Sequence, residues 1–388
     1  MNIRLRSGKD RPVRLGHPWI FSGAIADLDP ALEPGTIVRV HGADGAFLGV
    51  GYANPRCPIA VRMLAREDTA IDASFIARRV EAAVTLRRLV VPPETDAYRL
   101  VNGEGDALPG FVVDRFADVL VLQCLTAGAD RLRPLLVDAL LAACAPLGIL
   151  ERSRGSVRSA EGLSARVGVV HGEVPANVTV REGALRFRVA LMEGQKTGFF
   201  LDQRPNRALL GTLARGHTVL DAFAYSGAFA IAAASGGASR VVAVESSPRA
   251  VEIARDNVAV NGMSPSAVEL VCADVSRYLR ETADMFDLLV LDPPALAKRR
   301  ADVARATRAY KDLHLWAFRR ALPGALLMTF TCTPHIDAAL FRKVVLGAAT
   351  DAGRTVQLLQ HLGPGPDHPV ALGHPEGEYL HGLLVRAS

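Results

Sequence analysis

The chain has 388 residues, of which 49% are hydrophobic and 22% charged, and it carries a net charge of +5. This length exceeds that of one ordinary domain and predicts two or three, and the composition is that of a globular protein, which excludes a disordered or collagen-like chain. The isoelectric point of about 9.1 is a mild indication of a polyanionic partner.

The cysteines and the apolar segments narrow the protein class further. Five cysteines at wide spacing, with no Cys-x-x-Cys pair, argue against a disulfide framework and against a zinc site, so no metal is expected. The basic N-terminus is not followed by the apolar segment of a signal peptide, and no apolar run approaches the ~18 residues of a membrane span. A cytoplasmic enzyme without a membrane partner is therefore expected.

Positive charge gathers in two segments. The first 14 residues hold five basic side chains against Asp10, and residues 298–320 hold eight against Asp302 and Asp312. Such runs are as often solvated surface as binding sites. If they bind, the partner is a polyanion such as RNA.

The first 183 residues are expected to form two small domains. Residues 1–70 form a β-rich domain, because residues 36–40, 47–50 and 59–64 are β-prone and are separated by turn residues. Residues 71–183 form a mixed α/β domain, because hydrophobic residues at helical spacing alternate with strand-like runs. Its predicted helices are residues 71–89 and 131–145, and its predicted strands are residues 110–115, 119–125, 166–170 and 178–180.

Residues 184–388 alternate short apolar strands with helices. This alternation is typical of βαβ units and predicts an α/β domain with a parallel, doubly wound sheet. The predicted strands are residues 218–221, 241–245, 268–272, 287–291 and 325–330, and the predicted helices are residues 227–235, 249–261, 313–322 and 336–349.

The ends of these strands carry residues suited to a nucleotide-like ligand. The first strand leads through Asp221 to Gly227, which allows a tight turn before a helix whose N-terminus can bind an anion such as a methionine carboxylate. Glu245 ends the second strand, where it can accept two ribose hydroxyl hydrogen bonds. Asp274 follows the third and can accept a bond from an adenine amino group.

Each of these features also has an ordinary structural explanation, since a strand-end acid is often a helix cap. Their order and spacing together favour a ligand site. The turn argues against a nicotinamide dinucleotide, because it has Phe223 and Tyr225 where a G-x-G-x-x-G motif needs glycines. The fourth strand ends in Asp292, Pro293 and Pro294.

Several segments resemble the ribosomal RNA large-subunit methyltransferase I family. They are Gln195-Lys-Thr-Gly-Phe-Phe-Leu-Asp-Gln-Arg204, Asp221-Ala-Phe-Ala-Tyr-Ser-Gly-Ala-Phe229, Asp292-Pro-Pro294, Tyr310-Lys-Asp312 and Thr331-Cys-Thr333. Outside that region, Gly16-His-Pro-Trp-Ile-Phe-Ser-Gly23, Gly103-Glu-Gly-Asp-Ala-Leu-Pro-Gly110, Glu161-Gly-Leu163 and Pro375-Glu-Gly-Glu-Tyr379 are similar to the same family. The resemblance thus extends over nearly the whole chain.

The resemblance implies a PUA-like RNA-binding domain at residues 1–70, a central α/β domain at 71–183 and a Rossmann-like class I methyltransferase domain at 184–388. It implies S-adenosylmethionine as methyl donor, 23S ribosomal RNA as partner and carbon 5 of a cytosine as target. A homodimer is compatible with the sequence but is not indicated by it.

The residues expected at the site follow from the strand ends and from the resemblance. The resemblance implies that Phe199, together with Phe200, Gln203 and Arg204, helps to line the cofactor or substrate side of the site. The cofactor set is Phe200, Gln203, Arg204, Asp221, Phe223, Tyr225, Ser226, Gly227, Glu245, Ser246, Asp274, Val275, Asp292 and Pro293, and the RNA set is Lys196, Pro294, Lys298, Arg300 and Lys311.

Carbon 5 of a pyrimidine is a poor nucleophile, and addition of a thiolate to carbon 6 activates it. Cys332 directly follows a predicted strand at the expected site, so it is the candidate nucleophile. Cys57, Cys124 and Cys144 are expected to be core thiols. Asp292 is expected to stabilise charge at N3 of the base. The residue that removes the C5 proton, for which His335 and Lys311 lie nearby in the motifs, stays unassigned.

Three other functions compete with this one. Many RNA cytosine-5 methyltransferases carry a second cysteine after the motif proline, but here Ala295 stands there, so Cys332 would act alone. Methylation of a purine amino group commonly uses an aromatic residue at this place, and alanine cannot stack. Carbon-5 methylation of uracil uses the same thiolate chemistry and stays open, as does a non-catalytic ribosome-assembly factor that keeps the fold.

Overall fold

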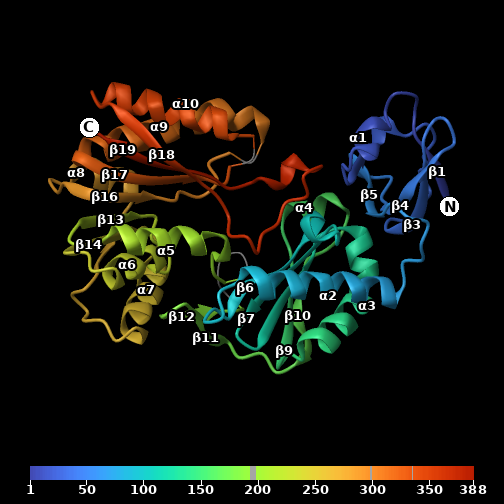
Figure 1. The fold of residues 1–388 in the computed structure, drawn as a ribbon, viewed down its shortest axis with the longest axis horizontal. Helices are drawn as coiled ribbons and strands as arrows, with labels where there is room; N and C mark the ends of the chain where they lie inside the picture. The colour runs from blue at the N-terminus through green and yellow to red at the C-terminus, as the bar shows by residue number, and fades with distance from the viewer. Residues whose placement is uncertain (193–197, 298, 334) are drawn as a thin grey trace. The chain divides into compact units, whose positions relative to one another are not determined.

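The computed structural model describes residues 1–192, 198–297, 299–333 and 335–388. The chain forms two compact units (Figure 1). Unit 1 consists of Met1–Gly183, Ala190–Gly198 and Pro366–Gly377, and unit 2 of Ala184–Val189, Phe199–Gly365 and Glu378–Ser388. Lys196 and Lys298, which were predicted to contact RNA, lie outside the described residues.

Unit 1 begins with a five-stranded sheet in the order β1-β3-β4-β5-β2. Its strands are β1 (Asn2–Arg4), β2 (Trp19–Phe21), β3 (Thr36–His41), β4 (Phe47–Ala53) and β5 (Ile59–Ala65), with the short helices α1 (Arg11–Arg14) and η1 (Ser22–Ala24) between β1 and β3. Ile3, Ile20, Val40 and Val61 form its buried core, because alternate side chains of each strand point inward. The three strands predicted here are confirmed.

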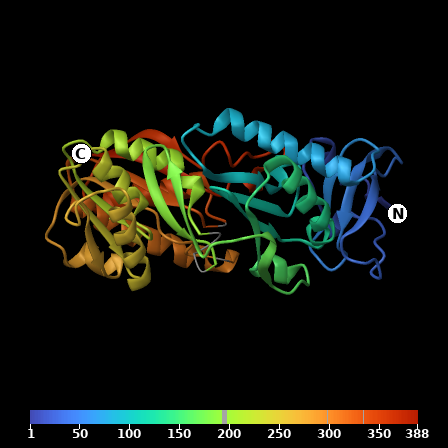
Figure 2. The same cartoon turned by 90° about the horizontal axis from the view of Figure 1, so that it is seen from below.

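The second sheet of unit 1 has the order β10-β9-β8-β7-β6. It contains β6 (Ala97–Asn102), β7 (Phe111–Phe116), β8 (Val119–Cys124), β9 (Gly148–Ser153) and β10 (Arg166–Gly172), with α2 (Ala73–Val90), η2 (Gly103–Asp106), α3 (Ala127–Cys144) and α4 (Ser156–Ala160). Figure 2 shows α2 lying along these strands. Ile76 and Val80 of α2 are fully buried, as their four-residue spacing predicted.

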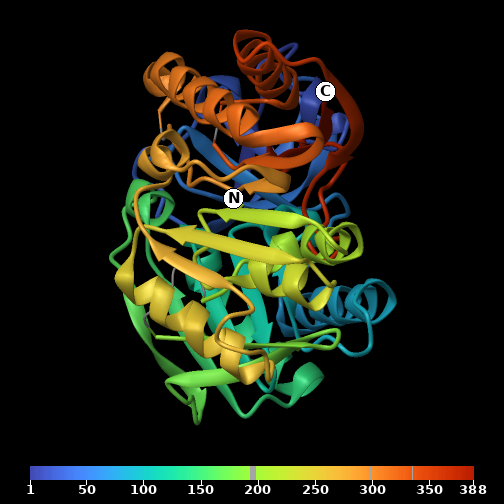
Figure 3. The ribbon, with the colours of Figure 1, turned by 90° about the vertical axis from the view of Figure 1, so that its left-hand side faces the viewer.

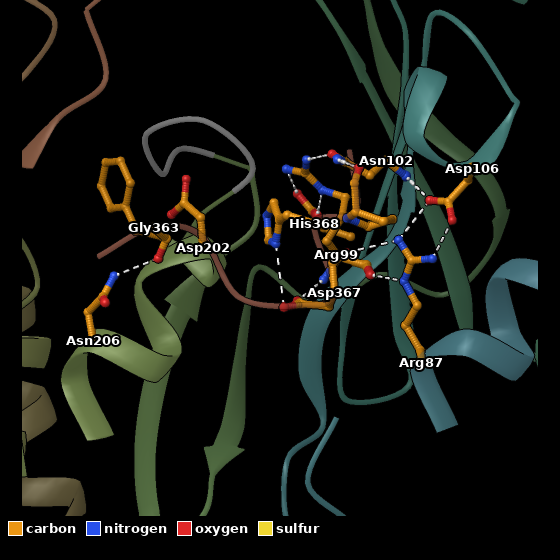
Figure 4. Close-up of polar contacts among 12 residues, drawn as sticks. Arg87, Arg99, Asn102, Asp106, Asp202, Asn206, Gly363, Asp367 and His368 are labelled. Atoms are coloured by element: carbon orange, nitrogen blue, oxygen red, sulfur yellow. Dashed lines mark hydrogen bonds and ion pairs between the residues drawn. The ribbon is translucent and has the colours of Figure 1, made fainter. Parts of the chain in front are cut away.

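A further segment of unit 1, Pro366–Gly377, comes from late in the chain and is held by a buried ion pair. Both terminal nitrogens of Arg87 donate to the Asp106 carboxylate, at 2.5 and 2.7 Å, and one also donates to the Asp367 carbonyl at 2.9 Å (Figure 4). Asp367 in turn accepts from the backbone N–H of Arg99 at 3.0 Å. These bonds satisfy the guanidinium inside the protein, where an unpaired charge is costly.

Unit 2 is built on a seven-stranded sheet in the order β15-β14-β13-β16-β17-β19-β18. The pairs from β15 to β17 are parallel, whereas β19 is antiparallel to both neighbours. The strands are β13 (Thr218–Ala222), β14 (Arg240–Glu245), β15 (Glu269–Cys272), β16 (Phe286–Leu291), β17 (Ala321–Thr331), β18 (Val356–Leu362) and β19 (His381–Ala387). The predicted doubly wound α/β fold is confirmed.

Helices cover both faces of this sheet (Figures 1 and 3). The helices α8 (Val275–Glu281), α9 (Val303–Arg320) and α10 (Ala338–Asp351) share one hydrophobic cluster with the strands, and α5 (Arg204–Leu213), α6 (Ala228–Ser235) and α7 (Pro248–Val260) pack next to one another. The remaining elements are η3 (Leu201–Gln203), η4 (Arg300–Asp302), η5 (Pro375–Gly377) and the hairpin of β11 (Asn177–Glu182) and β12 (Leu185–Ala190).

The structure corrects one predicted helix. Helix α9 was expected at residues 313–322 but begins at Val303, ten residues earlier, and ends at Arg320. Ala306 and Tyr310 are buried at the same helical spacing as Leu313 and Ala317, so the apolar face continues through the basic stretch. Among the described helices of the chain, none has both the length and the apolar character that a membrane span requires.

Candidate functional site

The carboxyl ends of β13, β14, β16 and β17 meet at one edge of the unit 2 sheet, because these strands are parallel neighbours. The turn after β13, Glu245 at the end of β14, Asp292 after β16 and Cys332 after β17 all follow these ends. Residues from four distant parts of the sequence are thus brought to the edge where open α/β sheets bind ligands.

The turn after β13 has an unusual backbone. Phe223 and Tyr225 have φ angles of +68° and +46°, which residues other than glycine rarely adopt. Gly227 has a φ of +74° at the start of α6. The N–H groups of Phe223 and Ala224 both donate to the Val244 carbonyl, at 3.1 and 3.0 Å. Such strain costs about 1–3 kcal/mol per residue and is concentrated at functional sites.

Glu245 fixes this turn with its carboxylate. One oxygen accepts from the N–H of Tyr225 at 2.9 Å, and the other accepts from the N–H of Ser247 at 2.8 Å and from the Ser246 hydroxyl at 3.3 Å. A carboxylate has about four acceptor positions, so it can also accept from a ligand. The glutamate predicted to bind a ribose therefore also holds the loop that lines the same site.

Asp221 lies under the turn and is 1% exposed. Its carboxylate accepts from the Ala230 N–H at 2.9 Å, inside the first turn of α6. Burial raises the pKa of Asp221 to about 7, and the nearby carboxylates of Asp292 and Glu245 add to the rise. The carboxylates of Glu245 and Asp292 contribute negative charge at this edge, which favours a cationic ligand, while the Arg207 guanidinium acts on Asp221 in the opposite direction.

This negative charge suits S-adenosylmethionine, which carries a positively charged sulfonium and an ammonium group. The first turn of α6 supplies N–H groups for its carboxylate, and the Glu245 oxygens can accept from ribose hydroxyls. The residues present therefore fit this cofactor.

Asp274 acts as a helix cap in the structure. Its side chain accepts from the N–H of Arg277 at 2.8 Å at the start of α8 and is otherwise exposed, while Val275 is buried in the core. The adenine contact predicted for Asp274 stays a prediction. It is compatible with the cap, because the cap occupies only one carboxylate oxygen.

The run 199–204 contacts the turn after β13. The rings of Phe200 and Tyr225 meet edge to face with centroids 5.4 Å apart. Gln203 and Arg204 are buried at the start of α5, where the Gln203 amide oxygen accepts from Asn206 at 2.6 Å. Phe199 is a core residue, packed against the ring of Phe187 at 5.0 Å.

The end of that run is held from two other parts of unit 2. Tyr379 donates from its hydroxyl to the Asp202 carboxylate at 2.7 Å, and the Asp202 carbonyl accepts from Gly365 at 3.0 Å. The Asn206 amide donates to the Gly363 carbonyl at 3.0 Å (Figure 4). These contacts were not predicted, because they join segments more than 150 positions apart.

Cys332 lies between two buried threonines and is itself half-buried. The hydroxyl of Thr333 accepts from the N–H of Leu296 at 3.0 Å, which ties the cysteine loop to the loop that begins at Asp292. Pro293 is buried in that loop, and Pro294 is exposed. The loops that carry the two residues predicted to do the chemistry are thus joined by a hydrogen bond.

The other four cysteines lie outside the loop that follows β17. Cys57 and Cys124 are buried, and burial raises the pKa of both thiols, that of Cys57 to about 11. Cys144 is half-buried with a raised pKa, and Cys272 is exposed at the end of β15. A thiol whose pKa is raised is a poorer source of thiolate at neutral pH.

Two of the residues predicted to contact RNA have defined positions outside the strand-end edge. Lys311 forms an ion pair with Asp351 of α10 at 2.7 Å, and Arg300 is exposed in η4. Asp302 pairs with Arg299 at 3.1 Å and with Arg305 at 3.3 Å. Several cations of the basic stretch are therefore already partly neutralised.

In the part of the chain that the structure describes, no group of three His, Cys, Asp or Glu side chains could hold a metal ion.

Comparisons with known proteins identify two domains and a family. A model of PUA-like domains matches residues 3–66, and a model of S-adenosylmethionine-dependent methyltransferases matches residues 163–371. Ribosomal RNA large subunit methyltransferase I of Alteromonas mediterranea is 39% identical over 391 residues, covering 100% of this chain and 98% of the relative. The protein of the same name from Shewanella denitrificans is 40% identical over 393 residues, covering 100% and 99%.

Solved structures share the fold over the whole chain. A candidate SAM-dependent methyltransferase from Streptococcus mutans has a TM-score of 0.85 at 21% identity, covering 100% of both chains. A candidate methyltransferase complexed with SAH has a TM-score of 0.87 at 22% identity, with the same coverage.

The predicted PUA-like domain, methyltransferase fold and S-adenosylmethionine cofactor are confirmed by these matches. On full-length identity, the chain belongs to the ribosomal RNA large subunit methyltransferase I family.

Proposed function

We propose that this enzyme forms 5-methylcytosine in large-subunit (23S) ribosomal RNA through a covalent bond between Cys332 and carbon 6 of the target base. The observation that carries the proposal is the position of Cys332. It follows β17 at the ligand-binding edge of the sheet, and its loop is hydrogen-bonded to the loop that begins at Asp292. The relatives named above are ribosomal RNA methyltransferases of the large subunit.

The chemistry needs a thiolate at this place. The Cys332 sulfur adds to carbon 6 of the flipped base, and the electron pair of the C5–C6 double bond becomes available at carbon 5. S-adenosylmethionine supplies an electrophilic methyl group, which carbon 5 takes. Loss of the C5 proton then restores the double bond and expels the Cys332 thiolate. The Asp292 carboxyl group, in its protonated form, donates a hydrogen bond to N3 and so stabilises the negative charge that develops on the ring during addition.

The residues proposed to hold the cofactor are those of the strand ends. Glu245 accepts from the ribose hydroxyls, Asp274 from the adenine amino group, and the first turn of α6 after Gly227 binds the carboxylate. The proposed lining is completed by Phe200, Gln203, Arg204, Phe223, Tyr225, Ser226, Ser246, Val275, Asp292 and Pro293. Asp221 contributes from beneath through the Ala230 N–H.

RNA binding is proposed for the β-rich domain at residues 1–70 and for residues 298–320, with Lys196, Pro294, Lys298, Arg300 and Lys311 contacting the substrate. The central domain at residues 71–183 and the methyltransferase domain at 184–388 complete the proposed organisation. An enzyme that acts on ribosomal RNA works where ribosomes assemble, so a cytoplasmic location belongs to the proposal.

Methylation of uracil at carbon 5 is the second candidate, because it uses the same thiolate addition and Cys332 serves both reactions equally. A non-catalytic assembly factor is disfavoured, because Asp292, Glu245 and Cys332 are all present at the strand ends. Methylation of a purine amino group is disfavoured by Ala295, which has no ring to stack on a base.

A methyl-transfer assay separates these functions. Enzyme, labelled S-adenosylmethionine and protein-free 23S RNA are incubated, and the RNA is digested to nucleosides. The proposal predicts label in 5-methylcytidine. Label in 5-methyluridine would show that the target base is uracil and not cytosine. Label in a methylated purine would contradict the thiolate mechanism. RNA binding without transfer, to either free RNA or isolated large subunits, would favour the assembly factor.

A further inference from the structure

Tyr310 of α9 is fully buried, and none of the steps above uses it. Its hydroxyl lies 2.8 Å from the Thr333 hydroxyl and 2.9 Å from the Thr331 hydroxyl, the two residues on either side of Cys332. One phenol oxygen thus contacts both flanks of the cysteine. A buried hydroxyl needs partners, and this one has two at short distance.

The hydroxyls of Thr331, Tyr310 and Thr333 belong to a closed ring of hydrogen bonds. The Thr331 hydroxyl donates to the Tyr310 oxygen, and the Tyr310 and Thr333 hydroxyls share a second bond in which either oxygen can be the donor. The ring closes through the backbone, where the Thr333 N–H donates to the Thr331 oxygen at 3.2 Å. Each hydroxyl has one proton and can accept two hydrogen bonds, so Tyr310 can stay bonded to both threonines whichever of Tyr310 and Thr333 donates.

The ring also reaches the second loop of the site. The Thr333 oxygen accepts from the N–H of Leu296, four residues after Asp292. Removal of the Tyr310 hydroxyl would therefore loosen the Cys332 loop on both sides and weaken its connection to the Asp292 loop. Hydrogen-bonded networks of this kind couple their members more strongly than isolated pairs do.

Tyr310 is itself held firmly. Its carbonyl accepts from Nδ1 of the buried His314 at 2.6 Å, and Nε2 of His314 accepts from the Thr329 hydroxyl at 2.6 Å. Burial lowers the pKa of His314 to about 4, so its imidazole is neutral at neutral pH and can make both hydrogen bonds. Burial raises the pKa of Tyr310, so its hydroxyl stays protonated within this set of bonds.

We propose that Tyr310 is a positioning residue that holds Cys332 in line with the Asp292 loop through the Thr331–Thr333 hydroxyl ring. It contacts neither the RNA nor the cofactor. The inference rests on the proposed role of Cys332 as nucleophile. A misplacement of about 1 Å can cost an enzyme about 10²-fold in rate, so loss of the hydroxyl should reduce the rate of carbon–sulfur bond formation while substrate binding is maintained.

The test is the Tyr310→Phe variant, which keeps the ring and removes only the hydroxyl. Tyr52→Phe is the matched control, since Tyr52 is equally buried in unit 1 and its hydroxyl also bonds a threonine hydroxyl, that of Thr126, at 2.7 Å. Three quantities are measured for both: kcat and KM for methyl transfer, the rate of covalent trapping on RNA carrying 5-fluorocytosine, and the affinity for S-adenosylmethionine.

Tyr310→Phe should lower kcat and the trapping rate together by about 10- to 100-fold, with KM values and cofactor affinity within about twofold of wild type. Tyr52→Phe should change neither rate. If Tyr310→Phe fails to fold, Thr333→Val replaces it, with Thr333→Ser as the conservative variant that keeps the hydroxyl and should restore the rates.

Wild-type trapping and turnover in Tyr310→Phe, while Cys332→Ala is inactive, would overturn the positioning role and leave the nucleophile in place. Turnover by Cys332→Ala would overturn the nucleophile and the positioning role with it. A rise in KM without a fall in kcat would also contradict the inference, because it would mean that the hydroxyl ring of Thr331, Tyr310 and Thr333 contributes to substrate binding.

Discussion

Glu245 shows how one side chain can serve both the ligand and the protein. Its two oxygens hold the backbone of Tyr225 and Ser247, so the carboxylate stabilises a strained turn and faces the proposed ribose position at once. The sequence could place Glu245 at a strand end by its spacing from Asp221. It could not show the backbone contacts, because they depend on the positive φ angle of Tyr225.

The first prediction separates these two roles of Glu245. Glu245→Ala should weaken S-adenosylmethionine binding by roughly 1.5–3 kcal/mol, because a charged acceptor is removed. Glu245→Gln keeps one carbonyl acceptor and has nearly the same shape, so it should show a smaller loss and a turn closer to wild type. Isothermal titration calorimetry measures the affinity of both variants for S-adenosylmethionine. Unchanged affinity in Glu245→Ala would show that the cofactor lies elsewhere.

The second prediction concerns the proton on Asp221. Its folded-state pKa of about 7 lies above its ordinary value of 3.8, so the folded protein holds a proton that the unfolded chain has released between these pH values. The stabilising contribution is therefore complete below the ordinary pKa and is lost as the pH rises through about 7.

Asp221→Asn removes this titration while keeping an acceptor for the Ala230 N–H. The wild-type protein should lose roughly 1–3 kcal/mol more unfolding free energy than Asp221→Asn between pH 5 and pH 8. Urea unfolding of both proteins without cofactor at the two pH values measures the difference. An equal change in both proteins would mean that Asp221 is ionised throughout this range.

At the scale of elements, regular apolar patterns were predicted well, whereas a strand with two buried charged residues, β9, was missed. Helix α2 and strands β13 and β14 were found within two residues of their bounds. Strand β9 was missed because Glu151, Arg152 and Ser153 interrupt its apolar residues, yet all of them are buried. Their charges are compensated by distant groups, among them Arg133 and the Leu191 carbonyl, which a local sequence pattern cannot reveal.

Helix α9 shows the same limit at the site. Its basic residues suggested a surface segment, whereas its buried face carries Tyr310 and His314 beneath the loop of Cys332. The matched motifs around residues 310 and 331 were visible in the sequence. That their hydroxyls bond to each other could not be predicted, because it requires the register of β17 against α9.

The third prediction concerns the Arg87 ion pair, which joins α2 to η2 and to the segment Pro366–Gly377. Arg87 and Asp106 are 1% and 4% exposed, so Arg87→Met leaves a buried carboxylate without its charge partner. The loss should be about 3–5 kcal/mol of unfolding free energy. Arg87→Met with Asp106→Leu should recover much of it, because no buried charge remains. Chemical denaturation decides this, and a loss below ~1 kcal/mol in the single variant would contradict the burial of this pair.

At the scale of the whole molecule, the family resemblance predicted the PUA-like and methyltransferase parts that the comparisons confirm. Composition alone indicated only a basic globular chain of several domains. The spacing of strands and helices predicted the doubly wound sheet. The return of Pro366–Gly377 to unit 1 was not predicted, since nothing in the local sequence shows which core a late segment joins.

The fourth prediction is that RNA affinity depends steeply on salt, because each neutralised phosphate releases counterions. Arg4, Lys9 and Arg11 are exposed, so replacing all three with glutamine should reduce the slope of log affinity against log salt by about 0.7–0.9 for every phosphate that is no longer neutralised. Arg277→Gln is the control, since Arg277 already pairs with Glu281 at 2.9 Å. A slope that is flat in the wild type would exclude phosphate contacts as the main source of affinity.

The most direct test of the account is covalent trapping at Cys332. RNA carrying 5-fluorocytosine at the target should capture the wild-type enzyme in the presence of S-adenosylmethionine, because fluorine blocks the proton loss that releases the enzyme, and peptide mass should place the adduct on Cys332. Cys332→Ala should fold, bind the cofactor and form no adduct and no product. Robust methyl transfer by Cys332→Ala, or an adduct on another cysteine, would contradict the nucleophilic role of Cys332.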